Sequence, residues 1–270
     1  GIYLVNSEVE YGISNTEIQL IPDGAVALYV YGGSVGPISS VTTSGGEYGI
    51  WIDGKNTELA VSIDHCLTNQ HAIAGVCVEK TTSTAVTISD TTTEKCNTGI
   101  WLRSVGSAIV KRCQVFKCFV GINVTESVVT ISGCTINNPI TPPGSPNREN
   151  EVLGEGIGIY GLDSDITVIG GTAIEGLQIG ILVEGWADVY IEYSRISYFV
   201  DEQGVRHLPL IGIWANNSDP NNFLYMEIRE TRIFGFNDTG LLINRTFAPD
   251  SEVWVFDADI RSNGDLFYIH

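Results

Sequence analysis

The sequence predicts an all-β fold, a parallel solenoid in which short strands wind into a single domain of about nine or ten rungs. Three observations support this fold class. A glycine followed by an aliphatic residue recurs along the chain, a strand-like V-x-I pattern follows these pairs, and helical periodicity is absent. Each rung leaves an apolar face that only its neighbours cover, so the repeats predict a stack. A β-sandwich would not repeat both patterns in one order.

The glycine–aliphatic pairs mark the first strand of each rung. Successive pairs are 22 to 37 residues apart, and the shortest interval gives the length of one tight turn. Residues 1–48 precede the first pair and read as strands and turns, so we expect the N-terminal first rungs there. The eight pairs are Gly49-Ile50, Gly75-Val76, Gly99-Ile100, Gly121-Ile122, Gly158-Ile159, Gly180-Ile181, Gly212-Ile213 and Gly240-Leu241.

A second strand follows, of the form V-x-I-x-x-small. Its alternation of apolar and polar residues is typical of a half-buried strand, and the small residue fits a tight inward bend. Residues 166–172 fit the pattern with one residue of slip, at Gly171 or Thr172. The clearest copies begin at Val61, Val86, Val129, Val189, Met226 and Val253, and their small residues are Cys66, Thr91, Cys134, Ser194, Thr231 and Ala258.

The composition excludes several classes of function. The net charge is −18, which opposes the phosphate contacts of a nucleic-acid binder and docking on an anionic membrane. Hydrophobic residues make up 43% of the chain, too many for intrinsic disorder. No apolar run approaches the roughly 18 residues of a membrane span. We therefore expect no nucleic-acid partner and no membrane insertion.

Two long links interrupt the regular rungs. The distance from the small residue to the next glycine is usually 8 or 9 residues, but it is 24 from Cys134 to Gly158 and 18 from Ser194 to Gly212. We expect the loops 137–157 and 197–211 to project from one edge of the solenoid. They form either the walls of a groove or plain surface loops.

Outward residues of stacked rungs fall into columns, because neighbouring strands lie about 4.8 Å apart. In the last three rungs the columns are Tyr190, Glu227, Trp254; Glu192, Arg229, Phe256; Tyr193, Glu230, Asp257; and Arg195, Arg232, Asp259. Such a face suits sugar binding, since rings stack on pyranose faces and charged groups fix hydroxyls. An ordinary surface of cross-rung ion pairs, such as Arg232 with Asp259, is the alternative.

Candidate site residues follow from these columns. Glu230 and Asp257 should lie one rung apart, near the roughly 5 Å separation of the carboxylates in a retaining glycosidase. They are the first catalytic candidates, followed by Glu192 and Glu227. The candidate substrate-binding residues are Tyr190, Trp254, Phe256, Arg229, Arg232 and Trp214.

A second column is more apolar and contains the residue two positions after each glycine. Outward tryptophans at several rungs are unusual on the surface of a monomer. They suit a carbohydrate platform, the seam of an oligomer, or a surface covered by a terminal segment. The column reads Trp51, Cys77, Trp101, Asn123, Tyr160, Leu182, Trp214 and Leu242.

The rung Gly121-Ile122 … Val129-x-Ile131-x-x-Cys134-x-Ile136 resembles those of right-handed parallel β-helices of the pectate-lyase-like superfamily, as does the opening Gly1–Val5 and Asn15–Ala25. This superfamily includes pectate lyases, polygalacturonases and phage tailspikes. The resemblance implies a right-handed coil and, for a tailspike, a homotrimer. It covers nearly the whole chain and is specific for the fold but weak for the chemistry.

The catalytic motifs of the two enzyme groups do not match. Ser62-Ile63-Asp64-His65 departs from the pectate-lyase W-I-D-H motif at its first residue, and R-x-P-x-x-R is absent. The polygalacturonase motifs N-T-D, G-H-G and R-I-K are absent as well. Asp64 and His65 also fit the outward and bend positions of an ordinary rung.

The cysteines follow the rungs rather than a metal-binding motif. There is no C-x-x-C among the six, and the four histidines show no ligand spacing, so we expect no metal and no cofactor. Cys113 and Cys134 take the same inward position in consecutive rungs, and Cys96 and Cys118 are 22 residues apart. Either disulfides or stacked buried thiols fit this spacing.

Together these features favour an extracellular, cell-surface or virion β-helix that binds a polysaccharide or cell-surface glycan, as a phage tailspike or tail-fibre domain does. Cleavage of the glycan by paired carboxylates would accompany binding. Two alternatives stay open: a secreted polysaccharide lyase or glycoside hydrolase, and a non-catalytic adhesin or filament subunit whose columns are assembly surfaces. Because strand-like sequence begins at Gly1, we expect either a segment of a larger protein or a mature secreted chain.

Overall fold

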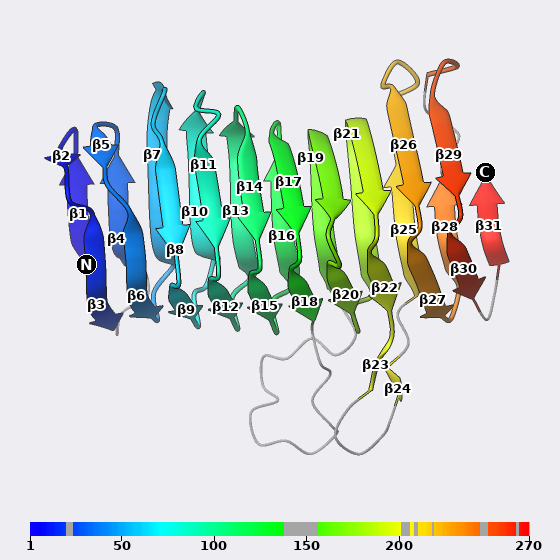
Figure 1. Cartoon of the computed structure of the whole chain (residues 1–270), viewed down its shortest axis with the longest axis horizontal. Coiled ribbons are helices and arrows are strands. Elements are labelled where there is room, and N and C mark those ends of the chain that lie inside the picture. The colour runs from blue at the N-terminus through cyan, green and yellow to red at the C-terminus, as the bar shows by residue number, and fades with distance from the viewer. Residues whose placement is uncertain are drawn as a thin grey trace.

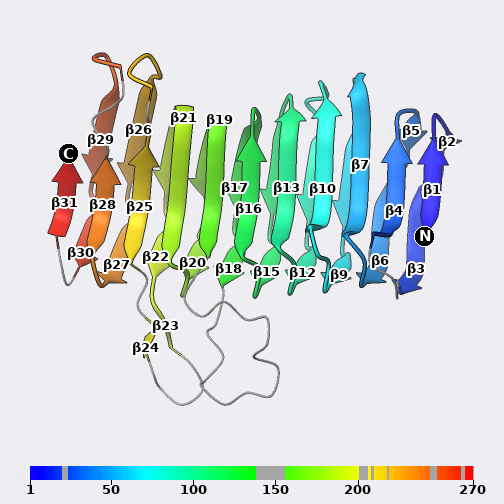
Figure 2. The same ribbon diagram turned by 180° about the vertical axis from the view of Figure 1, so that it is seen from behind.

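A computed structural model describes residues 1–19, 24–137, 156–200, 206–207, 210–217, 219–243, 248–262 and 265–269. These residues form a parallel β-solenoid of about nine turns without helices, which confirms the predicted fold class. The rungs follow one another along the long axis from the N-terminus to the C-terminus (Figures 1 and 2). The described part of the chain therefore contains no helix that could cross a membrane.

Three parallel ladders of strands make the wall of the solenoid, and ladder 1 contains the glycine–aliphatic pairs. Ile50, Val76, Ile100 and Ile122 are register partners in successive rungs. Ladder 1 comprises β1 (Ile2–Val5), β4 (Val26–Tyr31), β7 (Tyr48–Thr57), β10 (Ala74–Thr81), β13 (Thr98–Val105), β16 (Val120–Thr125), the first halves of β19 (Ile157–Ile169) and β21 (Ile179–Glu192), β25 (Ile211–Asn216), β28 (Thr239–Ile243) and β31 (Asp265–Ile269).

Ladder 2 contains the V-x-I strands. It comprises the first residues of β3 (Ile13–Gln19) and β6 (Ile38–Ser44), then β8 (Val61–Asp64), β11 (Val86–Ser89), β14 (Ala108–Lys111), β17 (Val128–Ser132), the second halves of β19 and β21, β26 (Leu224–Arg229) and β29 (Glu252–Phe256). Ala108-x-Val110 and the first residues of β3 and β6 complete the ladder beyond the strands that the V-x-I pattern predicted.

Ladder 3 is built from shorter strands. It comprises the ends of β3 and β6, then β9 (Leu67–Asn69), β12 (Thr92–Glu94), β15 (Gln114–Phe116), β18 (Thr135–Asn137), β20 (Ala173–Glu175), β22 (Arg195–Ser197), β27 (Arg232–Phe236) and β30 (Asp259–Ser262). Two further pairs lie outside the ladders: β2 (Glu8–Val9) with β5 (Ser34–Val35), and β23 (Phe199–Val200) with β24 (Arg206–His207).

The recurring glycine of ladder 1 permits a close approach between rungs. A Cβ built on Gly121 would lie 2.5 Å from the carbonyl oxygen of Gly158 in the next rung and would overlap Ile136. The same carbonyl contact recurs from Gly49 to Gly212. Any larger residue would push a neighbouring strand outward, which explains why the pattern requires glycine.

A sharp corner joins ladder 2 to ladder 3. The corner residue has a left-handed backbone in successive rungs, with φ of 50° at His65, 48° at Asp90, 53° at Arg112 and 60° at Gly133. The small residue that follows points inward and is buried, as predicted. In the slipped rung this residue is Thr172, whose Oγ1 accepts a hydrogen bond from the Cys134 amide at 3.4 Å.

The interior is one continuous apolar core. Ile50, Ile63, Ile131 and Ile191 are fully buried and belong to the same cluster. All six cysteines are buried free thiols, so the structure shows stacked thiols rather than disulfides. The loop expected at 137–157 lies largely outside the described residues, whereas the one expected at 197–211 contains the antiparallel pair of β23 and β24.

Candidate functional site

The outward face of ladder 2 carries the predicted columns in its last three rungs. Tyr190, Glu227 and Trp254 are register partners on β21, β26 and β29. The column of Glu192, Arg229 and Phe256 lies beside it, two residues further along each strand. The register therefore brings the aromatic and charged candidates onto one surface.

Two exposed aromatic rings form a flat surface at the last rung of ladder 2. Trp254 is 47% exposed and Phe256 is 42% exposed, and their rings stack with centroids 5.9 Å apart and planes within 3°. The guanidinium of Arg229 lies 5.1 Å from the Phe256 ring centroid, and Trp254 Nε1 donates a hydrogen bond to Glu252 Oε2 at 2.9 Å. These contacts fix the rings, and both side chains remain exposed to solvent.

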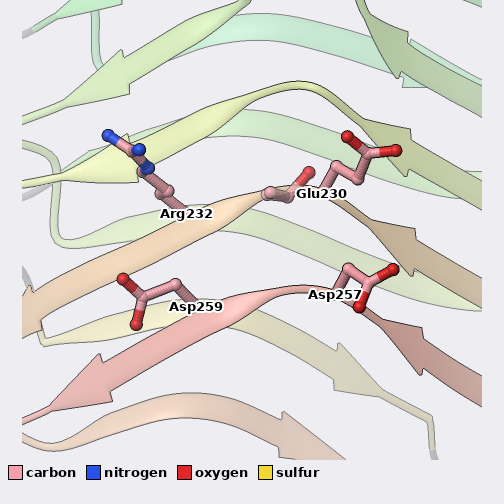
Figure 3. A pocket seen from close by; sticks show the side chains of 5 residues that line it. Glu230, Arg232, Asp257 and Asp259 are labelled. Carbon is pink, nitrogen blue, oxygen red and sulfur yellow. The ribbon is translucent and has the colours of Figure 1, made fainter.

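An open groove of about 530 Å³ lies at the corner where the rungs of β26 and β29 turn into ladder 3. It is lined by Glu230, Thr231, Arg232, Asp257 and Asp259 (Figure 3). The two catalytic candidates predicted first thus line one groove, together with one predicted substrate-binding arginine.

The corner conformation places the two candidate carboxylates at the rim of this groove. Glu230 has φ of 43° and Asp257 has φ of 48°, the left-handed corner described above. Thr231 after Glu230 turns inward and is fully buried, so Glu230 itself must point outward. Both acidic side chains project from equivalent positions of adjacent rungs (Figure 3). The Glu230 amide donates to the Phe256 carbonyl at 3.1 Å, which ties the two rungs together.

The two carboxylates have different hydrogen-bond environments. The Tyr193 hydroxyl, one rung earlier in the same column, donates to Glu230 Oε1 at 2.9 Å. This bond raises the pKa of Tyr193, because the phenol donates to a carboxylate. No described residue donates a hydrogen bond to the Asp257 side chain. The Tyr193 hydroxyl therefore fixes the position of the Glu230 carboxylate.

The alternative interpretation of this face included an ion pair between Arg232 and Asp259, but the described residues show none, although the two are register partners. Asp259 Oδ1 instead accepts a hydrogen bond from Arg261 Nε at 2.7 Å. The Arg232 side chain turns away from Asp259 (Figure 3). That alternative therefore does not hold for this pair, although both residues line the groove.

The other candidates lie outside the groove. Glu227 is only 8% exposed and accepts hydrogen bonds from the Tyr225 hydroxyl at 2.8 Å and from Arg229. Tyr190 bonds with Glu192, which together with burial raises the pKa of the phenol. Trp214 lies on β25 in ladder 1, where it packs against an outer apolar cluster. The hydrogen bond from Arg229 to Glu227 holds the arginine side chain in place.

Two aspartates on the same face were not among the predicted site residues. Asp165 and Asp188 are register partners on β19 and β21, each directly before its V-x-I strand. Burial raises the pKa of both carboxyl groups, and a neighbouring carboxylate adds to it: Asp188 for Asp165, and Glu227 for Asp188. Continuing the outward alternation two residues toward the strand start, from Tyr190 to Asp188, would have found them.

Asp165→Asn should stabilise the protein at neutral pH. A folded-state pKa above the unfolded value means that stability is fully present below the unfolded pKa and is lost as the pH rises through the folded pKa. We expect a gain of about 0.2–1 kcal/mol in the free energy of unfolding at pH 7, the range for screened like charges across two strands, and no gain at pH 3. Urea unfolding at both pH values measures this, and an equal gain at both would exclude the repulsion.

One cluster elsewhere in the described residues has metal-ligand chemistry. The ligand atoms of Asp64, His65 and Asp90 all lie within 4.8 Å of one another. His65 Nδ1 is 2.6 Å from Asp64 Oδ2, and Asp90 pairs with Arg112. Asp64 and His65 take the outward and corner positions predicted for an ordinary rung. Asp64 already pairs with His65, and Asp90 pairs with Arg112. We therefore interpret the cluster as a series of charged pairs along the corner.

Comparison with known proteins agrees with this architecture. Two solved structures that match the chain are from Azotobacter vinelandii. The A-module of mannuronan C-5 epimerase AlgE6 has 12% identity and a TM-score of 0.33, over 95% of this chain and 81% of that one. The A-module of AlgE4 has 15% identity and a TM-score of 0.32, over 100% and 81%. No curated protein matches the chain in sequence. The model of the family described as "Right handed beta helix region" matches residues 1–169, so the chain belongs to the right-handed β-helix family.

Proposed function

We propose that this β-helix binds a polysaccharide across the last rungs of ladder 2 and hydrolyses it in the groove of Glu230 and Asp257. The observation that supports this most directly is the position of that groove, beside the exposed stack of Trp254 and Phe256. A concave site lined by two carboxylates, next to flat exposed rings, matches what a glycan chain needs for binding and cleavage.

The chemistry follows from the two carboxylate environments. Adjacent rungs are about 4.8 Å apart, close to the roughly 5 Å between the carboxyl groups of retaining glycosidases. Glu230, held by Tyr193, attacks the anomeric carbon while protonated Asp257 gives its proton to the departing glycosidic oxygen. Water then attacks the anomeric carbon while Asp257 takes its proton, and the bond between that carbon and the Glu230 carboxylate breaks. The configuration at the anomeric carbon is retained.

The aromatic residues and arginines place the substrate for this reaction. A pyranose ring contacts the exposed pair of Trp254 and Phe256, in which Glu252 accepts from the indole N–H and Arg229 lies over the Phe256 ring. The Arg232 guanidinium offers hydrogen bonds to hydroxyl groups of the sugar at the cleavage point. Rings that are already oriented lose little entropy on binding, so the site is preorganised.

We further propose that the protein works outside the cell, at a cell surface or on a virion, as a homotrimeric tailspike or tail-fibre domain does. The support is the fold together with the resemblance of the rungs to that superfamily. The acidic net charge of −18 suits a soluble surface of this kind.

A panel of bacterial capsular and lipopolysaccharide glycans tests the function. We expect the protein to bind and shorten one class of glycan, with release of new reducing ends. Trp254→Ala should weaken binding by about tenfold, because one stacking face is lost. Trp186→Ala, which removes a tryptophan that is 43% exposed but far from the groove, is the matched control. Cleavage that is unchanged in Trp254→Ala would contradict the proposed binding surface.

A further inference from the structure

A second surface with binding chemistry lies on ladder 1, in the N-terminal half of the solenoid. Tyr29, Trp51, Cys77 and Trp101 are register partners on β4, β7, β10 and β13. The Trp51 ring lies 4.7 Å from the Tyr29 ring and stacks on Tyr48 at 4.6 Å. These rings are partly exposed, whereas Cys77 between the tryptophans is 2% exposed. The result is a row of rings along the solenoid axis.

A buried carboxylate anchors this row. Glu79 occupies an outward position on β10, yet its side chain is only 2% exposed. Its Oε1 accepts a hydrogen bond from Trp51 Nε1 at 3.0 Å, and its Oε2 pairs with Arg103. The Arg103 guanidinium in turn lies 5.2 Å from the Trp101 ring centroid. One carboxylate thus fixes an indole and a guanidinium, so the surface is rigid before any ligand binds.

The charges of this surface are layered. The acidic side chains lie underneath, with Asp53 at 7% exposure and Glu79 at 2%, while Lys80 at 41% and Arg103 at 39% face the solvent. Lys80 Nζ donates to Asp53 Oδ2 at 3.2 Å. Lys55 adds a further cation, 5.3 Å from the Tyr31 ring centroid. On a chain with a net charge of −18, a ligand approaching here meets cations first.

We propose that this patch, formed by Tyr29, Trp51, Trp101, Lys80 and Arg103 over Glu79, binds an acidic glycan chain. The rings contact the sugar faces, and the two exposed cations pair with carboxylates along the chain. Trp51 and Trp101 are two rungs apart, about 9.6 Å, so a chain lying along the axis contacts both. The patch alternates aromatic rings with charged groups, whereas the centre of a protein–protein interface is depleted of charged residues.

This inference rests on the proposed function in one respect: both surfaces bind a glycan. The patch holds the glycan, and the groove cleaves it. The two surfaces belong to different ladders and to opposite halves of the chain (Figure 1). Loss of one therefore leaves the other intact, which allows separate tests.

Binding of polygalacturonate and hyaluronate, with neutral dextran as the comparison, tests the proposal by isothermal titration calorimetry in 20 and 300 mM NaCl. We expect the two acidic polymers to bind and their affinity to fall with salt, because exposed ion pairs are screened. Trp101→Ala should weaken binding on the order of tenfold. This change removes no hydrogen bond between described residues, since Trp101 Nε1 has no such partner. Lys80→Gln should weaken binding and flatten the salt dependence.

Two controls separate this proposal from the groove. Trp186→Ala removes an exposed ring outside the patch and should bind as the wild type does. Glu230→Gln should also keep the affinity, so binding that persists there while cleavage is lost supports two independent sites. The proposal is overturned if neither acidic polymer binds, if dextran binds as tightly as they do, or if Trp101→Ala has the affinity of Trp186→Ala.

Discussion

Glu230→Gln is expected to lower the rate of glycan cleavage by at least about 10³-fold, because an amide cannot attack the anomeric carbon. Asp257→Asn should cost about 10²–10⁴-fold, since the leaving oxygen then departs without a proton. Neither change removes a buried contact, as both residues are exposed at the corner. Release of reducing ends from a glycan that the wild type cleaves measures both effects.

The matched control is Glu126→Gln. Glu126 is an exposed carboxylate with a left-handed backbone, φ of 50°, on the corner between ladders 1 and 2, so it shares the local structure of Glu230 but not the groove. Azide added to Glu230→Ala should restore cleavage with inversion at the anomeric carbon, because the small anion fills the space of the lost nucleophile. Full activity in Glu230→Gln would exclude this residue as the nucleophile.

Gly121→Ala is expected to lower the free energy of unfolding by about 3 kcal/mol, at the upper end of the range for overpacking. The new methyl group would meet the Gly158 carbonyl oxygen at 2.5 Å and Ile136, so two neighbouring strands must move. Because the same close contact recurs in the rungs on either side, the displaced strands have no free space into which to move. The midpoint of urea unfolding, followed by circular dichroism, measures the loss.

Gly133→Asn provides the comparison within one rung of Gly121. Gly133 has φ of 60°, but the nearest atom to its built Cβ lies 3.5 Å away, and the equivalent corner residues in the preceding rungs are Arg112 and Asp90. Asparagine tolerates this left-handed conformation, so the change should cost no more than about 0.5 kcal/mol. Equal losses in the two variants would contradict the claim that the close approach of rungs is what requires glycine at position 121.

The rungs were predictable because their pattern repeats with a physical cause. Gly121 is required by the carbonyl of the next rung, and the small residue by the bend, so both recur at fixed positions. The slip at Thr172 was also predictable, since the V-x-I strand and the inward residue remained recognisable on either side. Register then followed, and with it the columns that unite Glu230 with Asp257.

What the sequence did not reveal depends on side chains from distant rungs. Position alone assigns Glu79 to the surface, but Trp51 and Arg103 cover it from the rungs before and after. The direction of Arg232, away from its register partner Asp259, is likewise a matter of rotamers (Figure 3). An outward position in a solenoid therefore predicts which residues are neighbours, but not which of them are exposed or paired.

The most direct test of the central claim is a crystal structure of Glu230→Gln with an oligosaccharide of a glycan that the wild type cleaves. We predict a sugar ring stacked on Trp254 and Phe256, with the glycosidic oxygen within hydrogen-bond distance of Asp257. A glycan bound elsewhere on the solenoid, with the groove of Glu230 and Asp257 free of sugar, would contradict it.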